Sequence, residues 1–161
     1  MYPFVDRAAY RVMRWLEHNS IVLLRVNLGL IFCWFGGLKF FPGACSAENI
    51  AGRTMEALSF GIMSPDWSVP FLAVWECLIG VGLVTGRYLR GTLLLLFTQM
   101  MGTFTPLVIF PEEMFREPFV PTLEAQYILK NVVLVSAGLV IGVGYRAKKA
   151  PEPVPDAAPA D

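Results

Sequence analysis

The stretch LLRVNLGLIFCWFGGLKFFP, from Leu23 to Pro42, decides the fold of this chain. It is apolar and long enough to cross a membrane as a helix, yet it carries Arg25, Asn27 and Lys39. A charged group costs about 2.5–3.5 kcal/mol at the centre of a spanning helix, so such groups usually face a partner or a wet cavity. The stretch therefore predicts a span packed among other helices, with Arg25 and Asn27 as structural polar residues near its inner end.

The rest of the chain supplies those helices. Its 161 residues are 55% hydrophobic and 16% charged, against about a quarter charged in an ordinary soluble domain. The apolar residues fall into long runs, which predict an all-α, four-helix transmembrane bundle over residues 20–145. We expect the spans at about 20–41, 69–86, 91–110 and 124–144, with a kink at Pro106 in the third. The net charge is zero and no basic, aromatic-interleaved patch is visible, so the expected partner is the lipid bilayer and not nucleic acid.

Three segments outside the spans have characters of their own. Residues 1–19 place Arg7, Arg11 and Arg14 on one helical face, which predicts an amphipathic interfacial helix on an anionic membrane surface. The alternative is a solvated lead-in helix. The loop residues SAENIAGRTMEALSF have apolar side chains near helical spacing and predict a short helix across the outer end of the bundle. The Pro- and Ala-rich residues 146–161 predict a disordered tail.

The basic residues predict the orientation of the bundle. With the N-terminus inside, the outer loops hold only Arg53 and Arg116, and the other basic residues outside the spans lie on the inner side. Basic residues accumulate on the cytoplasmic side of membrane proteins. Both termini are therefore expected in the cytoplasm. The inner set is Arg7, Arg11, Arg14, Arg87, Arg90, Arg146, Lys148 and Lys149.

Each span contributes a polar group to the outer half of the expected bundle. At about 1.5 Å per residue, Glu76 lies roughly 10 Å and Lys130 roughly 9 Å below the outer ends of their helices. This depth predicts a Glu76–Lys130 ion pair with Lys39 above it. The pair either holds two helices together or helps to bind a small ligand. The candidate ligand-binding residues are Lys39, Glu76, Gln99, Lys130, Asn131, Trp34 and Trp75, with Phe104 as a further wall.

The remaining features assign no chemistry. Cys33, Cys45 and Cys77 show neither CxxC spacing nor a nearby histidine pair, so no metal site is expected. We interpret Cys33 and Cys77 as small apolar filler, with a redox pair as the alternative. No catalytic motif is present, and the catalytic residues stay unknown. The pairs Gly82 and Gly86, and Gly138 and Gly142, predict close helix packing.

The polar motifs resemble those of the DoxX superfamily, in particular its YkgB-type branch. An arginine early in the first span (Arg25) precedes WFGGLKF, the second span contains WECLIGVGLVTGRYLR, and the last contains QYILKNVVLVSAGLVIG. The loop after Pro42 departs from the YkgB-type pattern. The resemblance covers about residues 20–145. It implies a multi-pass, four-helix protein of a bacterial inner membrane and makes a quinone or a membrane redox partner plausible.

The sequence is compatible with three functions. The leading hypothesis is an accessory or quinone-contacting subunit of a membrane oxidoreductase complex, because the chain shows no recognisable redox cofactor site of its own. The second is a small-solute or proton-coupled carrier or channel that uses the buried charges as a relay. The third is a structural or assembly protein without a ligand. Homo-oligomers are compatible with all three.

Overall fold

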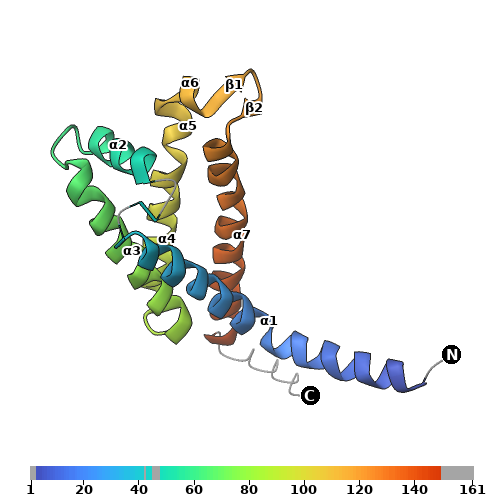
Figure 1. Cartoon of the computed structure of the whole chain (residues 1–161). Helices are drawn as coiled ribbons and strands as arrows, with labels where there is room; N and C mark the ends of the chain where they lie inside the picture. The colour runs from blue at the N-terminus through green and yellow to red at the C-terminus, as the bar shows by residue number, and fades with distance from the viewer. Residues whose placement is uncertain (1–2, 42, 45–47, 150–161) are drawn as a thin grey trace, which may run out of the picture.

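The computed structural model describes residues 3–41, 43–44 and 48–149. In this part of the chain, seven helices and a two-stranded hairpin follow one another (Figure 1). Four helical segments are long and apolar enough to cross a membrane: Ala9–Leu38, Asp66–Thr85, Leu89–Ile109 and Leu123–Arg146. The predicted four-helix transmembrane bundle is confirmed.

Helix α1 (Pro3–Leu38) is a single unbroken helix that contains both the expected interfacial helix and the first span. No glycine or proline occurs between Phe4 and Leu28, so nothing in the sequence breaks the helix between the two segments. The N-terminal part of α1 projects away from the other helices (Figure 1). That this part lies on a membrane surface stays a prediction.

Helix α3 (Pro65–Thr85) packs against α1 in the antiparallel sense and at very short range. A Cβ atom added at Gly29 would lie 2.8 Å from the carbonyl oxygen of Gly80, and one added at Gly36 would lie 2.9 Å from Cβ of Glu76. The absence of side chains at these positions lets the two backbones touch, as in other membrane helix pairs. Beyond its last turn, α3 ends at Gly86, whose φ of 69° favours glycine.

The third span is divided into α4 (Leu89–Phe104) and α5 (Pro106–Ile109), which confirms the expected kink at Pro106. Proline has no N–H to donate to the preceding turn. At the break, Thr105 N–H donates to the carbonyl of Gly102, and the hydroxyls of Thr103 and Thr105 donate to Gln99 and Met101. These bonds satisfy the backbone groups that the kink would leave without partners.

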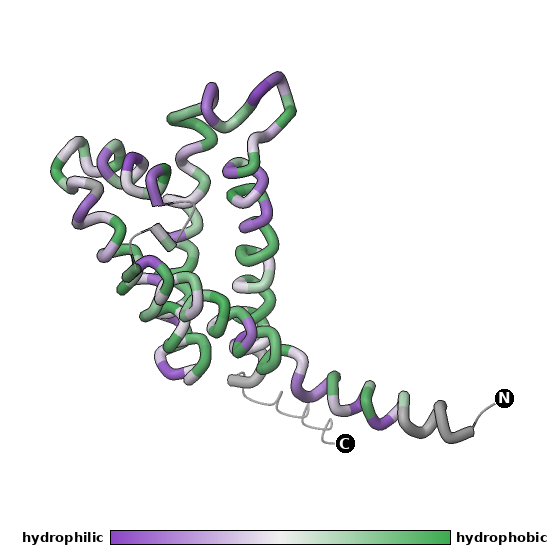
Figure 2. The backbone as a smooth tube through the Cα atoms, viewed as in Figure 1, coloured by the Kyte–Doolittle hydropathy of each residue, from purple (hydrophilic) through white to green (hydrophobic). Residues whose placement is uncertain are grey.

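Helix α7 (Leu123–Lys149) supplies the fourth span and packs on α4 through small residues. A Cβ atom at Gly138 would meet the Phe97 ring at 3.2 Å, and one at Gly142 would meet Leu93 at 3.3 Å. The middle stretches of α4 and α7 are hydrophobic, whereas the outer segments carry hydrophilic residues (Figure 2). The predicted tail falls partly on α7, which continues to Lys149, and its residues 150–161 lie outside the described residues.

A cap of short elements covers the end of the bundle opposite the α3–α4 turn, the end that the sequence predicts to be the outer one. It consists of α2 (Glu48–Leu58), α6 (Pro111–Met114) and an antiparallel hairpin of β1 (Phe115–Glu117) and β2 (Val120–Pro121). Helix α2 is the predicted outer loop helix. The sequence interpretation did not include the hairpin, whose strands of three and two residues are too short to show an alternating pattern.

The outer ends of α1 and α3 are not level with each other. Gly36 faces Glu76, eleven residues from the start of α3 at Pro65, so the end of α1 at Leu38, two residues further on, lies about nine residues, or roughly 14 Å, from that start. Helix α2 packs against α3 and α5 above the end of α1. This arrangement places the last residues of α1 inside the bundle and forms the site described next.

Candidate functional site

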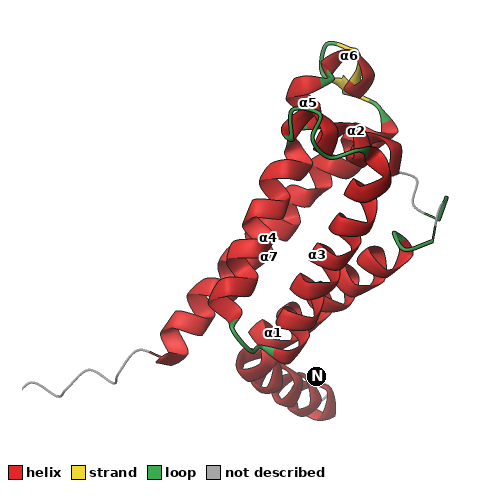
Figure 3. Cartoon of the chain, turned by 90° about the vertical axis from the view of Figure 1, so that its left-hand side faces the viewer, coloured by secondary structure: helices red, strands yellow, loops and turns green. Residues whose placement is uncertain are grey.

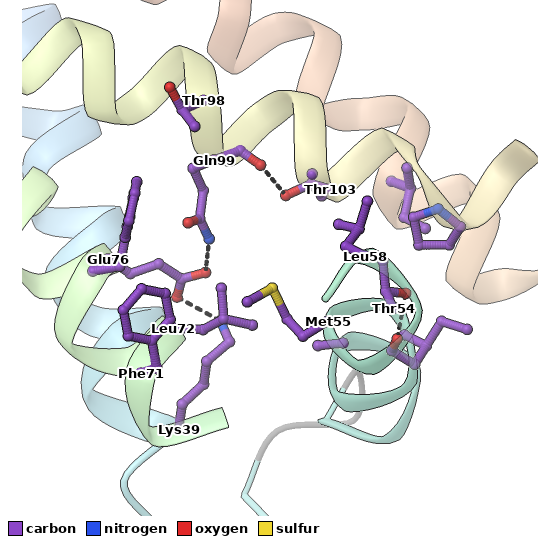
Figure 4. A pocket seen from close by; sticks show the side chains of 16 residues that line it. Lys39, Thr54, Met55, Leu58, Phe71, Leu72, Glu76, Thr98, Gln99 and Thr103 are labelled. Carbon is purple, nitrogen blue, oxygen red and sulfur yellow. Dashed lines mark hydrogen bonds and ion pairs between the residues drawn. The ribbon is translucent and has the colours of Figure 1, made fainter. Parts of the chain in front are cut away.

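The carboxylate of Glu76 is the centre of a polar cluster between α1, α3 and α4. Lys39 Nζ lies 2.5 Å from Glu76 Oε2, and Gln99 Nε2 donates to Glu76 Oε1 at 2.9 Å (Figure 4). The side chains of Lys39 and Glu76 are only 11% and 12% exposed. Each carboxylate oxygen therefore has a donor, and the charge of Glu76 is compensated by a lysine that is equally buried.

The predicted Glu76–Lys130 ion pair is wrong in its second partner. Lys130 is an exposed residue of α7, and its Nζ lies 4.9 Å from the centroid of the Tyr127 ring. The depth estimate assumed that all four helices start at one level. Since α1 ends well below the start of α3, Lys39 sits beside Glu76 instead of above it.

A pocket of about 300 Å³ opens beside this cluster, beneath α2. Figure 4 shows α3, α4 and α2 around it, with Lys39 reaching toward Glu76 at one end. Apart from the Lys39–Glu76–Gln99 end and a few threonines, its walls are apolar. The apolar lining comes from Ile50, Ala51, Met55 and Leu58 of α2, Phe71, Leu72 and Trp75 of α3, and Gly102, Pro106 and Ile128.

The kink in α4 and α5 forms one wall of the pocket. Gly102, Thr103 and Pro106 all line it, while the Thr103 hydroxyl is held by the carbonyl of Gln99 at 2.9 Å. On the opposite wall, Trp75 Nε1 donates to the carbonyl of Leu95 at 3.2 Å and ties α3 to α4. Both contacts fix the backbone next to Gln99 and Glu76, which limits how far the polar end can move.

The roof helix α2 is attached to α6 by an exposed ion pair between Arg53 and Glu113. The two terminal guanidinium nitrogens of Arg53, Nη1 and Nη2, donate to the carboxylate of Glu113 at 2.7 and 2.8 Å, and the guanidinium carbon lies 4.6 Å from the Phe110 ring centroid. The hydrogen bonds from Arg53 lower the pKa of the Glu113 carboxyl, and the same contact raises the pKa of Arg53. We call this contact the α2 clasp.

The structure brings together only some of the residues predicted to bind a ligand. Lys39, Trp75, Glu76 and Gln99 line the pocket. Trp34, which is 70% exposed, and Lys130 and Asn131 of α7 do not line it. The predicted wall Phe104 packs between two apolar clusters and is also absent from the lining.

The structural polar residues and the cysteines lie away from the pocket. The Arg25 guanidinium lies against Gly86 at the inner end of α3, and Asn27 is exposed on α1. Cys33 and Cys77 are free thiols, and Cys33 Sγ lies against Gly80 while Cys77 Sγ lies against Gly36. The two sulfurs fill the α1–α3 contact, in line with the filler interpretation. Cys45 lies outside the described residues.

The sequence interpretation missed the roof of the pocket, formed by Thr54 and Met55 among others. The apolar spacing of α2 was visible and could have indicated a face packed on the bundle. Thr98, Thr103 and Phe71 gave no such signal, because threonines and aromatic residues are common in membrane helices.

These observations define the class of the protein: it is a small multi-pass membrane protein. Its described residues form a polar cluster around Glu76 and an apolar pocket beside it, beneath α2. The family model described as DoxX matches residues 20–110, more than half of the chain. The chain therefore belongs to the DoxX family, and its YkgB-type branch stays a prediction. No curated protein and no solved structure matched the chain.

Proposed function

We propose that this DoxX-type protein binds the ring of a quinone in the pocket beneath α2, as an accessory subunit of a membrane redox system. The observation that carries the proposal is the polar end of an otherwise apolar pocket, formed by Lys39, Glu76 and Gln99. Binding sites for small molecules commonly combine apolar walls with a few polar groups that set orientation.

The hydrogen-bonding capacity of the cluster supports a ligand that carries carbonyl oxygens. The ammonium group of Lys39 has three N–H donors and the amide of Gln99 has two, and the bonds to Glu76 use one of each. The remaining donors suit an acceptor such as a quinone carbonyl, while the aromatic and aliphatic walls suit its ring. The volume of about 300 Å³ is at the small end of ligand pockets and fits a single ring with the start of a side chain.

In this proposal the chain binds and orients the quinone. A bound quinone supplies the capacity to accept electrons and protons. The electrons come from a partner oxidoreductase, in the membrane or peripheral to it, and the Lys39–Glu76 pair keeps a charge-compensated donor beside the ring.

The proposal is tested by measuring quinone in protein purified in mild detergent. We expect mass spectrometry to find quinone in the native protein and about tenfold less in Lys39→Met, because a hydrogen bond from a charged group contributes about 1.5–3 kcal/mol. Lys130→Met is the matched control, since this lysine is exposed and outside the pocket. Met55→Trp should also contain less quinone, because the larger side chain fills the pocket without touching the ion pair.

Four results would contradict this function. If the native protein contains no quinone, or if Lys130→Met loses as much quinone as Lys39→Met, the pocket is not a quinone-binding site. Proton or solute flux in liposomes that disappears in Glu76→Gln would point to the carrier instead. A Lys39→Met protein that only melts at a lower temperature, with ligand and flux unchanged, would point to a structural protein.

A further inference from the structure

The exposed residues of the pocket lining show where the pocket opens. Leu58 is 44% and Phe71 43% exposed, and Thr98 also belongs to the exposed residues. These three residues come from α2, α3 and α4 respectively, so they surround one opening. We call them the pocket mouth.

The remaining residues of the pocket lining are buried or partly buried. Pro106 and Ile128 are buried, α2 forms the roof, and the Trp75–Leu95 hydrogen bond joins α3 to α4 below. Figure 3 shows α2 lying at the upper end of α3 and α4, the two helices that carry Phe71 and Thr98. The opening is therefore lateral, between α3 and α4, and does not point along the bundle axis.

Two of the three mouth residues, Phe71 and Thr98, lie within the spanning segments, while Leu58 lies on α2 above them. Phe71 lies six residues inside α3, about 9 Å from its start at Pro65, and Thr98 lies eleven residues, about 16 Å, before the end of α5 at Ile109. Both residues belong to helices that are long and apolar enough to cross a membrane. At this depth the medium outside the mouth is hydrocarbon and not water.

We infer that the ligand reaches this pocket sideways from the bilayer, through the mouth at Leu58, Phe71 and Thr98. The ligand is a lipid with a small acceptor head group on a single prenyl-type chain: the head lies at Lys39 and Gln99, and the chain leaves past Thr98 into the acyl chains. Thr98 is then a specificity-determining residue, because its size decides whether a chain can occupy the mouth. This inference rests on the proposed quinone function and adds the route and the chain.

The test compares two ligands on protein in lipid nanodiscs: a prenylated benzoquinone and the same ring without its prenyl chain. In Thr98→Phe, we expect binding of the prenylated ring to weaken by about tenfold or more, and that of the bare ring by about threefold or less. Leu94→Phe is the matched control, since Leu94 is one turn away on α4, 67% exposed and absent from the pocket lining. Thr98→Ser should bind both ligands as the native protein does.

A photoreactive group on the prenyl chain gives a second measurement that does not depend on substitutions. Labelling of peptides around Phe71 and Thr98 supports the lateral route, and labelling confined to the outer loops overturns it. If Thr98→Phe and Leu94→Phe weaken the prenylated ring equally, the route is overturned while the quinone function stands. If neither ligand binds the native protein, the quinone function itself fails.

Discussion

At the scale of single residues, the Lys39–Glu76 pair is the feature on which the site depends. Two charged groups that are each about one-tenth exposed are stable only because they compensate each other. Gln99 adds a neutral donor to the second carboxylate oxygen. The pair costs desolvation energy that an apolar pair would not, which is consistent with a site that needs a polar end.

Removing one member of the pair should cost more than removing both. We expect Lys39→Met to lower the free energy of unfolding by about 3 kcal/mol, because it leaves the Glu76 carboxylate buried without a cation. The double variant Lys39→Met, Glu76→Gln should recover most of that loss. Denaturant unfolding in mixed micelles measures the four proteins as a double-mutant cycle. Additive losses would show that the two groups do not interact.

The misplaced partner of Glu76 shows what sequence reasoning lacks at this scale. Ala125, Ile128, Gly138 and Ile141 form the buried stripe of α7. Lys130 follows Ile128 by two residues, about 200° around the helix, and so points away from the bundle. Because α7 is apolar on nearly every side, its sequence pattern alone did not show which stripe is buried. Depth along the helix was estimated from residue number, whereas rotation about the axis was left undetermined.

At the scale of elements, close contact between α1 and α3 fixes which residues meet. Gly29, Gly36 and Gly80 let the backbones approach, and this contact sets the register that brings Lys39 to Glu76. The positions of the four spans followed from their apolar runs. The difference in level between the end of α1 and the start of α3 could not be predicted, because the sequence of one helix does not show how far along the other helix it packs.

A methyl group at the α1–α3 contact should therefore disturb the site from a distance. In Gly29→Ala the new Cβ would lie 2.8 Å from the Gly80 carbonyl oxygen and 2.9 Å from Val84 N, which are backbone atoms that cannot move aside alone. We expect a loss of about 1–3 kcal/mol in stability and weaker quinone binding. Gly37→Ala is the control on the same helix, since nothing lies within 4 Å of its Cβ position. Equal effects of the two substitutions would contradict the close contact.

The α2 clasp predicts a pH dependence of the roof helix. The Arg53 hydrogen bonds lower the pKa of Glu113 from its ordinary value of 4.5. A carboxylate with a lowered pKa stabilises the folded state above that ordinary value and loses the effect as the pH falls through the lowered pKa. Hydrogen exchange of α2 amides, corrected for intrinsic rates, should therefore rise only in the acidic range.

The control for the α2 clasp is Glu112, the residue next to Glu113 on α6. Glu113→Gln should raise the exchange of α2 amides at neutral pH, whereas Glu112→Gln should leave it unchanged, because Arg53 binds Glu113 and not Glu112. Both substituted positions are exposed, so the fold is expected to persist in each variant. Faster exchange in both would show that any loss of charge on α6 loosens the roof.

At the scale of the whole molecule, the charges of the two ends differ in sign. Arg87 lies in the α3–α4 turn and Arg90 in the first turn of α4, while the outer cap carries Glu112, Glu113 and Glu117. Because basic residues tend to be retained in the cytoplasm, we predict that the cap and the pocket beneath it belong to the outer half of the membrane. The site and its lateral mouth would then exchange ligand with the outer leaflet.

This orientation is tested with two exposed residues at opposite ends. Phe119 at the hairpin tip is 96% exposed and Tyr88 in the α3–α4 turn is 91% exposed, so a cysteine at either position is accessible to a maleimide. In a Cys45→Ser background, a membrane-impermeant maleimide should label Phe119→Cys in intact cells and label Tyr88→Cys only after the membrane is opened. The reverse pattern would place the cap in the cytoplasm and turn the mouth toward the inner leaflet. Since the pocket geometry is the same in either case, that result would change the source of the ligand and leave its binding residues in place.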